Sequence, residues 1–483
     1  MTELRLPWLE LSILAPALGA IAVARCRDSD TARKWCVVVC GIALFFALGA
    51  WQDFQLLQAN EAHDHWQILS HWLGDETFVI DQLSAPLFPL SALLYFLTTV
   101  ATVRTKIRRF SFTATLVSET ILLATLSCKD PRWVIGLLAV GTVPPYIELV
   151  ARKKPTRAYL VHMLLFVGLM IAGWSFVESE GNTRIHTLWA VVPLFAAVLI
   201  RAGIAPFHCW VTDLFEHATF GTALLHMAPM VGAYAAVRLV LPVAPDWVLR
   251  TMGVFSLVTA VYSSGMALVE RDARRFFCNL YMSNAGLVLV GLELVTPLGL
   301  TGALCIWLSV ALALCGFGLT LRGLEARRGR LSLMEFRGLY DHTPNLAMCF
   351  MLTGLASVGF PGTFGFVGSE LLVDDAVVAY PFVGVAVVLA TALNGIAIVQ
   401  AYFRLFTGTT YASSVSLRIR VRERYAVLVL AALILIGGLN PQPLVHSRSL
   451  AAKEILEERE AMSKGTATPP SHASAAATAK SAH

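Results

Sequence analysis

The sequence predicts an all-α membrane protein that crosses the bilayer many times. Of its 483 residues, 57% are hydrophobic and only 14% are charged, and the mean hydropathy is +0.67. A soluble protein would carry about a quarter charged residues. Apolar runs of the roughly 20 residues that a helix needs to cross a bilayer recur along the whole chain. The net charge of +5 therefore reflects loop composition and does not indicate nucleic-acid binding.

The apolar runs predict about fourteen transmembrane helices. They lie near 8–24, 35–52, 79–101, 111–127, 133–150, 158–176, 188–207, 220–240, 251–269, 276–294, 299–320, 345–378, 382–406 and 425–440. Residues Met1–Pro7 contain one basic residue and no cleavage site, so we expect the first helix to be retained.

Loop charges predict the orientation of these spans. Basic residues cluster in the loops after odd-numbered spans, as in Arg25–Lys34, Arg104–Arg109 and Arg152–Arg157, whereas the other loops are acidic or neutral. Positive charges favour the cytoplasmic side. We therefore expect a multi-pass protein of the inner (plasma) membrane whose N-terminus lies outside.

One stretch places ionisable groups inside the apolar region. Arg201 ends an apolar run, Pro206 and His208 follow at a break, and the next apolar helix carries His226. A charge inside a bilayer costs several kcal/mol unless it faces protein or water. The arrangement predicts a path for protons or other ions. In the alternative interpretation, Arg201 only snorkels from the end of a span.

A second break follows late in the chain, and Glu370 lies directly after it. Its residues Gly359, Pro361, Gly362 and Gly365 cannot continue a regular helix. Two such interruptions predict two inverted five-helix repeats. The predicted division is three helices in 1–110, repeats in 111–240 and 251–406, a last helix in 407–445 and a largely disordered tail in 446–483.

Four motifs in order resemble one family. They are Asp81-Gln-Leu-Ser-Ala-Pro; Arg201…Pro206-Phe-His208-Cys-Trp210…Ala223-Leu-Leu-His226; Asp272-Ala-Arg274-Arg275…Ser283-Asn-Ala-Gly286; and Gly338-Leu…Pro344…Gly359-Phe-Pro361-Gly-Thr-Phe-Gly365-Phe. The chain resembles the antiporter-like membrane subunits of respiratory complex I, Mrp-type antiporters and membrane-bound hydrogenases. The resemblance covers nearly all of residues 75–408.

The resemblance implies a proton axis, and this chain departs from it. In the family, a glutamate in the fifth span, a lysine in the seventh, a Lys or His in the eighth and a Lys or Glu in the twelfth form that axis. Here the corresponding residues are Ala139, Arg201, His226 and Ser369, the last followed by Glu370. Arginine stays protonated and does not readily pass a proton on. Three positions of the axis are thus altered, and His226 is retained.

Other ionisable residues are candidates to compensate. Glu119 lies in the middle of the fourth span and is either a partner of Arg201, an acid of a half-channel or a structural group. His162 is either a proton relay or a hydrogen-bonded core histidine, and His208 serves either proton transfer or the helix break. Glu148 fits an interfacial charge. A metal site is conceivable in the His-containing loop 61–72, but an HxH pattern in a polar loop is usually solvated. The nine scattered cysteines lack CxxC and Cys/His ligand spacing, and we expect no metal site.

Three functions remain open. The first is a proton-conducting subunit of a complex, and specifically one resembling the DAB inorganic-carbon uptake systems. In those systems, an antiporter-like chain works with a large cytoplasmic zinc protein that converts CO2 to bicarbonate. The second is a subunit of a respiratory or hydrogenase complex, or of an Mrp-type Na+/H+ antiporter. The third is a non-conducting scaffold for a soluble enzyme or another antiporter-like chain. We expect no cofactor and no catalysis by this chain itself.

Overall fold

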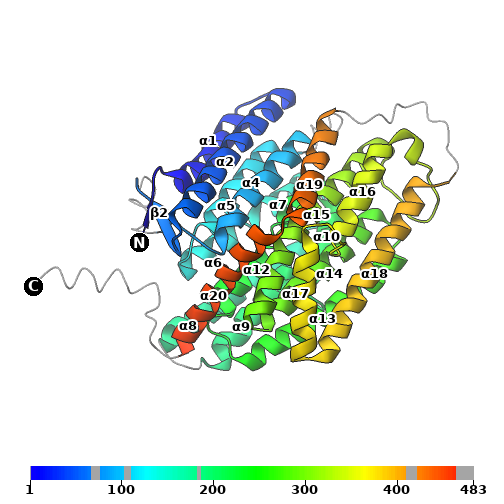
Figure 1. The fold of residues 1–483 in the computed structure, drawn as a ribbon. Coiled ribbons are helices and arrows are strands. Elements are labelled where there is room, and N and C mark those ends of the chain that lie inside the picture. Colours follow the sequence, from blue (N-terminus) through cyan, green and yellow to red (C-terminus); the bar gives the residue numbers. More distant parts are fainter. Residues whose placement is uncertain (1, 67–76, 103–109, 182–185, 409–420, 464–483) are drawn as a thin grey trace, which may run out of the picture.

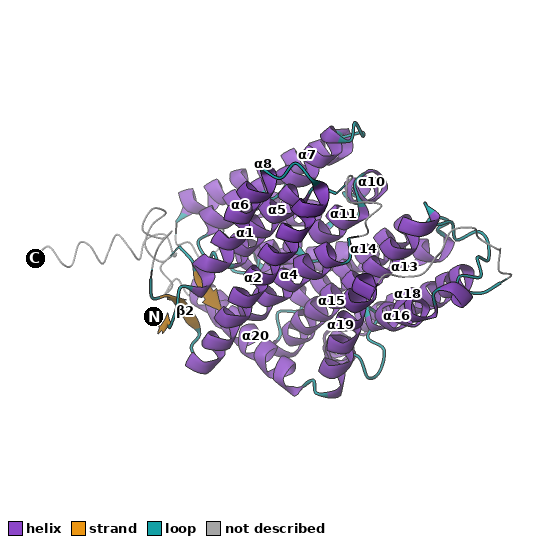
Figure 2. Cartoon of the chain, turned by 90° about the horizontal axis from the view of Figure 1, so that it is seen from above, coloured by secondary structure: helices purple, strands orange, loops and turns teal. Residues whose placement is uncertain are grey.

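The computed structural model describes residues 2–66, 77–102, 110–181, 186–408 and 421–463 (Figure 1). They form a bundle of helices with a small sheet at one edge, where the strands are visible in Figure 2. The sheet has the order β1 (Thr2–Leu4), β2 (Glu61–Asp64) and β3 (Val79–Asp81), with β1 parallel and β3 antiparallel to β2.

The first part of the bundle runs to residue 240. Its helices are α1 (Trp8–Ala24), α2 (Ser29–Leu57), α4 (Ser84–Val100), α5 (Phe112–Leu126), α6 (Pro131–Val140), α7 (Val143–Ala151), α8 (Arg157–Glu180), α9 (Leu188–Ala202), α10 (Cys209–His217), α11 (Phe220–Met227), α12 (Val231–Ala235) and the π-helix η2 (Ala236–Val240).

The remaining helices begin at residue 246. They are α13 (Asp246–Val269), α14 (Ala273–Glu293), α15 (Pro297–Arg328), the short 3-10 helix η3 (Tyr340–His342), α16 (Pro344–Ala356), α17 (Gly365–Ala379), α18 (Pro381–Phe406), α19 (Val421–Leu439) and α20 (Gln442–Ser463). The most buried are α14 and α15, whose apolar windows are enclosed completely. The near-uniform apolar composition of α15 explains its position, because a helix that is apolar all round is buried on all sides.

The all-α, multi-pass fold is confirmed. Among the described residues, eight helical segments are long and apolar enough to cross a membrane, and a bent pair, α19 with α20, brings the number to nine. Five shorter apolar helices of 10–17 residues accompany them. Every predicted span coincides with one of these helices or with a broken series of helices. The boundaries of the two inverted repeats remain a prediction.

Glycines explain the two predicted breaks. Gly203 ends α9 with φ +73°, and Gly359 and Gly362 have φ of +71° and +82° between α16 and α17. Side chains other than glycine rarely adopt such angles. The structure adds two interruptions that the sequence analysis missed: α6 ends before Thr142, and α11 is separated from α12 near Met230, with φ +50°.

The C-terminal tail requires a correction. A largely disordered tail was expected from residue 446, but residues 442–463 form α20, which bends by 81° from α19 and packs against α15; the remainder, 464–483, lies outside the described residues. Buried contacts explain its order. Arg448 is 1% exposed and donates hydrogen bonds to the carbonyls of Gln82 and Leu83, and Arg459 donates to those of Leu241 and Ala244.

The contacts of α20 agree with the predicted alternation of loops. It touches β2, the segment before α4, the α5–α6 loop and the segment before α13, all predicted to lie opposite the basic loops. The predicted basic-side segments contact one another as well: Arg274 pairs with Glu325, and Arg275 with Glu216. The structure thus sorts these loops into the two predicted groups.

Candidate functional site

The break between α9 and α10 holds Arg201 inside the bundle. Its side chain comes from the last turn of α9 and is only 4% exposed. The guanidinium donates to the backbone carbonyl of His226 at 3.3 Å, and its carbon lies 5.7 Å from the ring centre of Trp210. Met227 Sδ is 4.0 Å away. Arg201 and His226, predicted as neighbours, are thus brought together.

A small cavity of about 50 Å³ opens beside these two residues. Its polar lining consists of Tyr95, Thr115, Ser118, Thr125, Arg201, Thr222 and His226. This volume has room for a few water molecules. The wall formed by Leu137, Leu138 and Gly141 is apolar, and it adjoins Ala139, where the resemblance implies an acid. The missing carboxylate therefore leaves one side of the cavity without charge.

Aromatic rings hold His226 in place. The rings of Tyr159 and Trp210 each lie 6.2 Å from the imidazole, and both rings are fixed by hydrogen bonds to carbonyls, that of Tyr159 to Thr142 and that of Trp210 to Ile200, each at 2.8 Å. His226 Nε2 has no hydrogen-bond partner within the described part of the chain. A buried nitrogen of this kind is available for a water molecule in the adjoining cavity.

Glu148 reaches the same cavity through a hydroxyl group. Its carboxylate is buried, accepts the Thr219 N–H at 2.6 Å, and also accepts the Thr222 hydroxyl. Arg152 lies 3.4 Å from it on the side of the basic loops. Glu148 therefore caps the N-terminus of α11 while Thr222 lines the cavity, and it is more than the interfacial charge that its position in the sequence suggested.

Glu119 lies on another flank and is fully buried. Cys40 Sγ donates to Glu119 Oε2 at 3.0 Å, and Glu119 Oε1 is without a partner among the described residues. Tyr95, which lines the cavity, hydrogen bonds with Ser118 and interacts electrostatically with both Glu119 and Arg201. Tyr95 and Ser118, the residue next to Glu119 in sequence, thus both line the cavity.

The expected ion pair of Arg201 is absent from the described residues. Arg201 pairs with neither Glu119 nor Glu370, and its polar contacts are with the His226 carbonyl and neighbouring aromatic residues. Glu119 is held by the α2 thiol instead, and Glu370 is exposed on α17. Of the three interpretations of Glu119, the one that makes it the partner of Arg201 is therefore not supported by the described residues.

The two remaining histidines lie apart from the Arg201 contacts. His162 Nδ1 contacts the Ala158 carbonyl at 2.7 Å, as a core histidine bonded within its own helix would. His208 precedes α10, packs edge-on against Tyr262 at 5.9 Å, and interacts electrostatically with His162. Only His208 therefore lies at the break that contains Pro206, whereas His162 belongs to α8.

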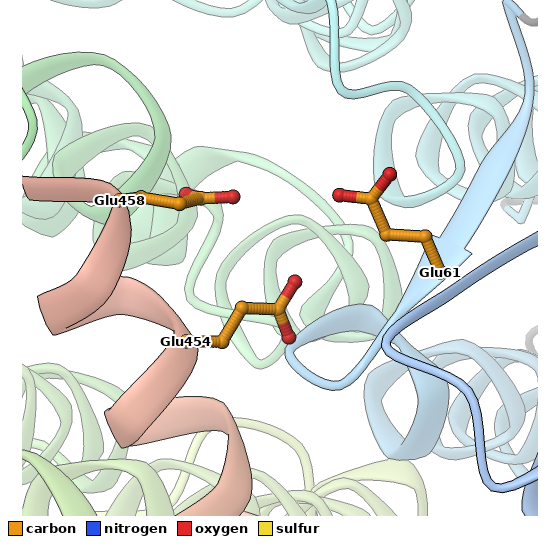
Figure 3. Close-up of side chains that lie close together, drawn as sticks. All are labelled: Glu61, Glu454 and Glu458. Atoms are coloured by element: carbon orange, nitrogen blue, oxygen red, sulfur yellow. The ribbon is translucent and has the colours of Figure 1, made fainter. Parts of the chain in front are cut away.

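Sequence reasoning missed a second group of charges, on the side opposite the basic loops. Asp81 and Arg238 form a buried ion pair at 2.6 Å. The intramembrane-charge argument applied to Arg201 could have identified Arg238, which lies in an equally apolar run. Figure 3 shows Glu61, Glu454 and Glu458 close together. Lys129 contacts Glu61 and Glu458, so an ammonium group supplies the positive charge there.

Comparisons with known proteins agree with this geometry. The family model described as "NADH:quinone oxidoreductase/Mrp antiporter, TM" matches residues 159–394. NAD(P)H-quinone oxidoreductase chain 4 of Synechococcus elongatus is 26% identical over 85% of this chain and 83% of its own. NADH-quinone oxidoreductase subunit M of Mycobacterium tuberculosis is 28% identical over 52% of this chain and 46% of its own.

A solved structure shares the fold. A chain of the Mrp complex from Dietzia sp. superposes with a TM-score of 0.82 at 17% identity, over 95% of this chain and 99% of that chain. The family match covers the broken α9–α10 region with Arg201 and His226, and continues from α11 into the first half of α18; the cavity-lining residues of α4 to α7 precede it. The chain is therefore similar to the antiporter-like membrane subunits of NADH:quinone oxidoreductases and Mrp antiporters, and its residues 159–394 match the model of that family.

Proposed function

We propose that this chain conducts protons across the membrane as one subunit of a multisubunit complex. The observation that carries the proposal is the cavity where a buried arginine, an imidazole nitrogen without a protein partner and room for water meet. Ionisable groups in membrane spans are expensive to bury and mark ion pathways. The relatives named above are subunits of larger assemblies, which supports a role within a complex.

In this proposal, the residues around the cavity have different roles. His226 carries the proton, because an imidazole both accepts and donates one. Arg201 stays charged and acts as a fixed positive field beside the path. Glu148 connects the basic side to the cavity through Thr222, and so takes over from the acid missing at Ala139. Glu119 lies on the other flank behind Tyr95 and Ser118.

We further propose that proton flow is coupled to inorganic-carbon uptake, with a large cytoplasmic zinc protein as partner. The altered axis supports this choice, since Ala139 and Arg201 depart from the pattern of respiratory subunits. The clustered arginines of the basic loops offer a docking surface for a soluble protein. The alternative partners are those of a respiratory or hydrogenase complex or an Mrp-type antiporter, and the relatives' names support that alternative.

Proton flux into liposomes tests conduction directly. The purified complex is reconstituted with a pH-sensitive dye inside the vesicles, and a potassium gradient with valinomycin drives the protons. We expect flux from the wild-type complex and background flux from His226→Gln. Equal flux from both would overturn the assignment of His226. No flux from a well-folded wild-type complex would favour the scaffold function.

Copurification tests the partner. The tagged chain is isolated in mild detergent, and the bound proteins are identified together with their zinc, flavin and iron contents. A large soluble chain that contains zinc would support inorganic-carbon uptake. Further antiporter-like chains with flavin or iron–sulfur subunits would overturn it and assign the chain to a respiratory complex.

A further inference from the structure

A second hollow lies on the outer surface of the bundle, away from the Arg201 cavity. It is an open groove of about 600 Å³ along α18, and its lining includes Leu355, Ala392, Gly395, Ile396, Val399 and Phe403. Ala392 and Gly395 provide the floor, because their small side chains leave space between larger neighbours. The exposed residues Phe382, Val385 and Leu389 continue the apolar face of α18.

The groove ends at Arg404, and the backbone of Arg337 lies next to it. Arg404 lies in the last turn of α18 and lines the groove, and its guanidinium carbon is 4.8 Å from the ring centre of Phe336, which lines the opposite edge. The Arg337 N–H donates to the Arg404 carbonyl at 3.0 Å, so the two residues are adjacent. Among the described residues, neither arginine forms an ion pair with a carboxylate, although exposed Glu335 is close in sequence.

The length of the groove matches one leaflet. Ala392 and Arg404 are separated by 12 residues of a continuous helix, or about 18 Å at a rise of 1.5 Å per residue. Half of the roughly 30 Å hydrocarbon core is about 15 Å. The groove therefore runs from the basic side of the membrane to near its midplane, with positive charge only at the interfacial end.

We propose that this groove binds an anionic phospholipid of the basic-side leaflet, with an acyl chain along α18 and its phosphate at Arg404. Charge complementarity selects this occupant, because apolar atoms line the deep part and Arg404 stands where a headgroup lies. Anionic lipids of the cytoplasmic leaflet attract basic residues at this level. The site is separate from the proposed proton path.

Gly395 offers a way to close the groove without disturbing the core. A Cβ at Gly395 meets no atom within 4 Å, so a large side chain there extends into the groove. Gly168 on α8 is a matched control, since a Cβ there also meets nothing within 4 Å and the residue is exposed outside the groove. Gly395→Phe and Gly168→Phe therefore add the same bulk at two places.

Native mass spectrometry of the purified complex measures the bound lipid. The complex is delipidated and then supplied with phosphatidylglycerol or phosphatidylcholine at equal concentration. We expect retention of phosphatidylglycerol to fall about five-fold in Arg404→Gln, the effect of one interfacial arginine on anionic lipid. We expect a comparable or larger loss in Gly395→Phe, whereas Gly168→Phe retains the wild-type amount.

Two results would overturn the proposal. The first is equal retention of both lipids with no effect of Arg404→Gln, which describes ordinary annular lipid. The second is occupation by protein: a photoreactive residue at Ile396 would then crosslink to another subunit and not to phosphatidylglycerol. A crosslink to phosphatidylglycerol that Gly395→Phe abolishes supports the lipid site.

Discussion

The two broken spans have similar backbones and different polarity. At the first break, Arg201 is buried beside His226, and aromatic rings surround both. At the second, between α16 and α17, the buried polar side chains are the hydroxyls of Ser357 and Thr363. Glu370, the acid nearest to this break, is exposed. The same helix interruption therefore serves a charged site in one half and neutral packing in the other.

Neutral contacts continue through the helices around the second break. Asn394 Nδ2 donates to Ser283 Oγ at 2.7 Å, and both side chains are buried between α14 and α18. Among the described residues, no buried lysine or histidine lies in α13 to α18, where the buried acids are Glu293 and Asp375. A proton at His226 therefore leaves through the first half or passes along water, hydroxyl groups and these two carboxylates. This difference concentrates the proposed conduction in a few residues near Arg201.

The largest expected difference between the two breaks is in proton flux after the ionisable side chains at each break are replaced by glutamine. We expect His226→Gln and Arg201→Gln to reduce proton flux at least about ten-fold, which corresponds to about 1.4 kcal/mol in the barrier. Glu370→Gln should leave flux near the wild-type value, because that side chain lies outside the cavity. Liposome flux measured on complexes with matched elution profiles provides the comparison. A loss in Glu370→Gln equal to that in His226→Gln would contradict the asymmetry.

Replacement of the two buried acids of the first half, Glu148 and Glu119, should have smaller and unequal effects on proton flux. Glu148→Gln removes the carboxylate that reaches the cavity through Thr222, so we expect flux to fall several-fold. Gln at this position keeps hydrogen-bond acceptance at the α11 N-terminus, and folding should be preserved. Glu119→Gln should reduce flux less if Glu148 is the main access group. The reverse order of effects would assign access to Glu119 and Tyr95.

Near the second break, the stability of the protein should depend on side-chain volume. A Cβ at Gly368 on α17 would lie 2.8 Å from the Cys305 Cβ and 3.0 Å from the Ile306 backbone nitrogen. Gly368→Ala should therefore destabilise the protein by about 1–3 kcal/mol, the usual effect of overpacking. Gly395→Ala is the control, because nothing lies within 4 Å of its added methyl group. Thermal unfolding in detergent should give a lower Tm for Gly368→Ala alone.

Local sequence signals were sufficient for the framework and for part of the site. Apolar runs indicate the spans, and Pro206 together with the glycines and proline of 359–365 indicates the two main breaks. Arg201 and His226 were predictable because a buried charge in a membrane span is costly. The partners of Glu119 were not, since Cys40 is 79 residues away and nothing in either helix specifies the contact. The order of α20 likewise depends on Arg448 and carbonyls 365 and 366 residues distant.

The smallest effect that we predict concerns a buried acid outside the membrane spans. Asp64 in β2 accepts the backbone N–H groups of Leu9 and Glu10, at 3.2 and 2.8 Å, and burial raises its pKa to about 7. The folded state then binds a proton more tightly than the unfolded state, whose pKa is near 3.8. Stability contributed by this group is present below about pH 4 and declines as the pH rises to about 7.

Tm should therefore be a few degrees lower at pH 8 than at pH 5, since in large domains each kcal/mol moves Tm by about 2 °C. Asp64→Asn should reduce this difference and leave the pH dependence of proton flux unchanged. An altered flux profile in Asp64→Asn would place a proton-carrying group outside the first break. An unchanged Tm difference would show that other groups determine the pH dependence of stability. Asp64 is buried but lines no part of the Arg201 cavity, so an unchanged flux profile in Asp64→Asn would agree with proton conduction only by groups that adjoin the cavity.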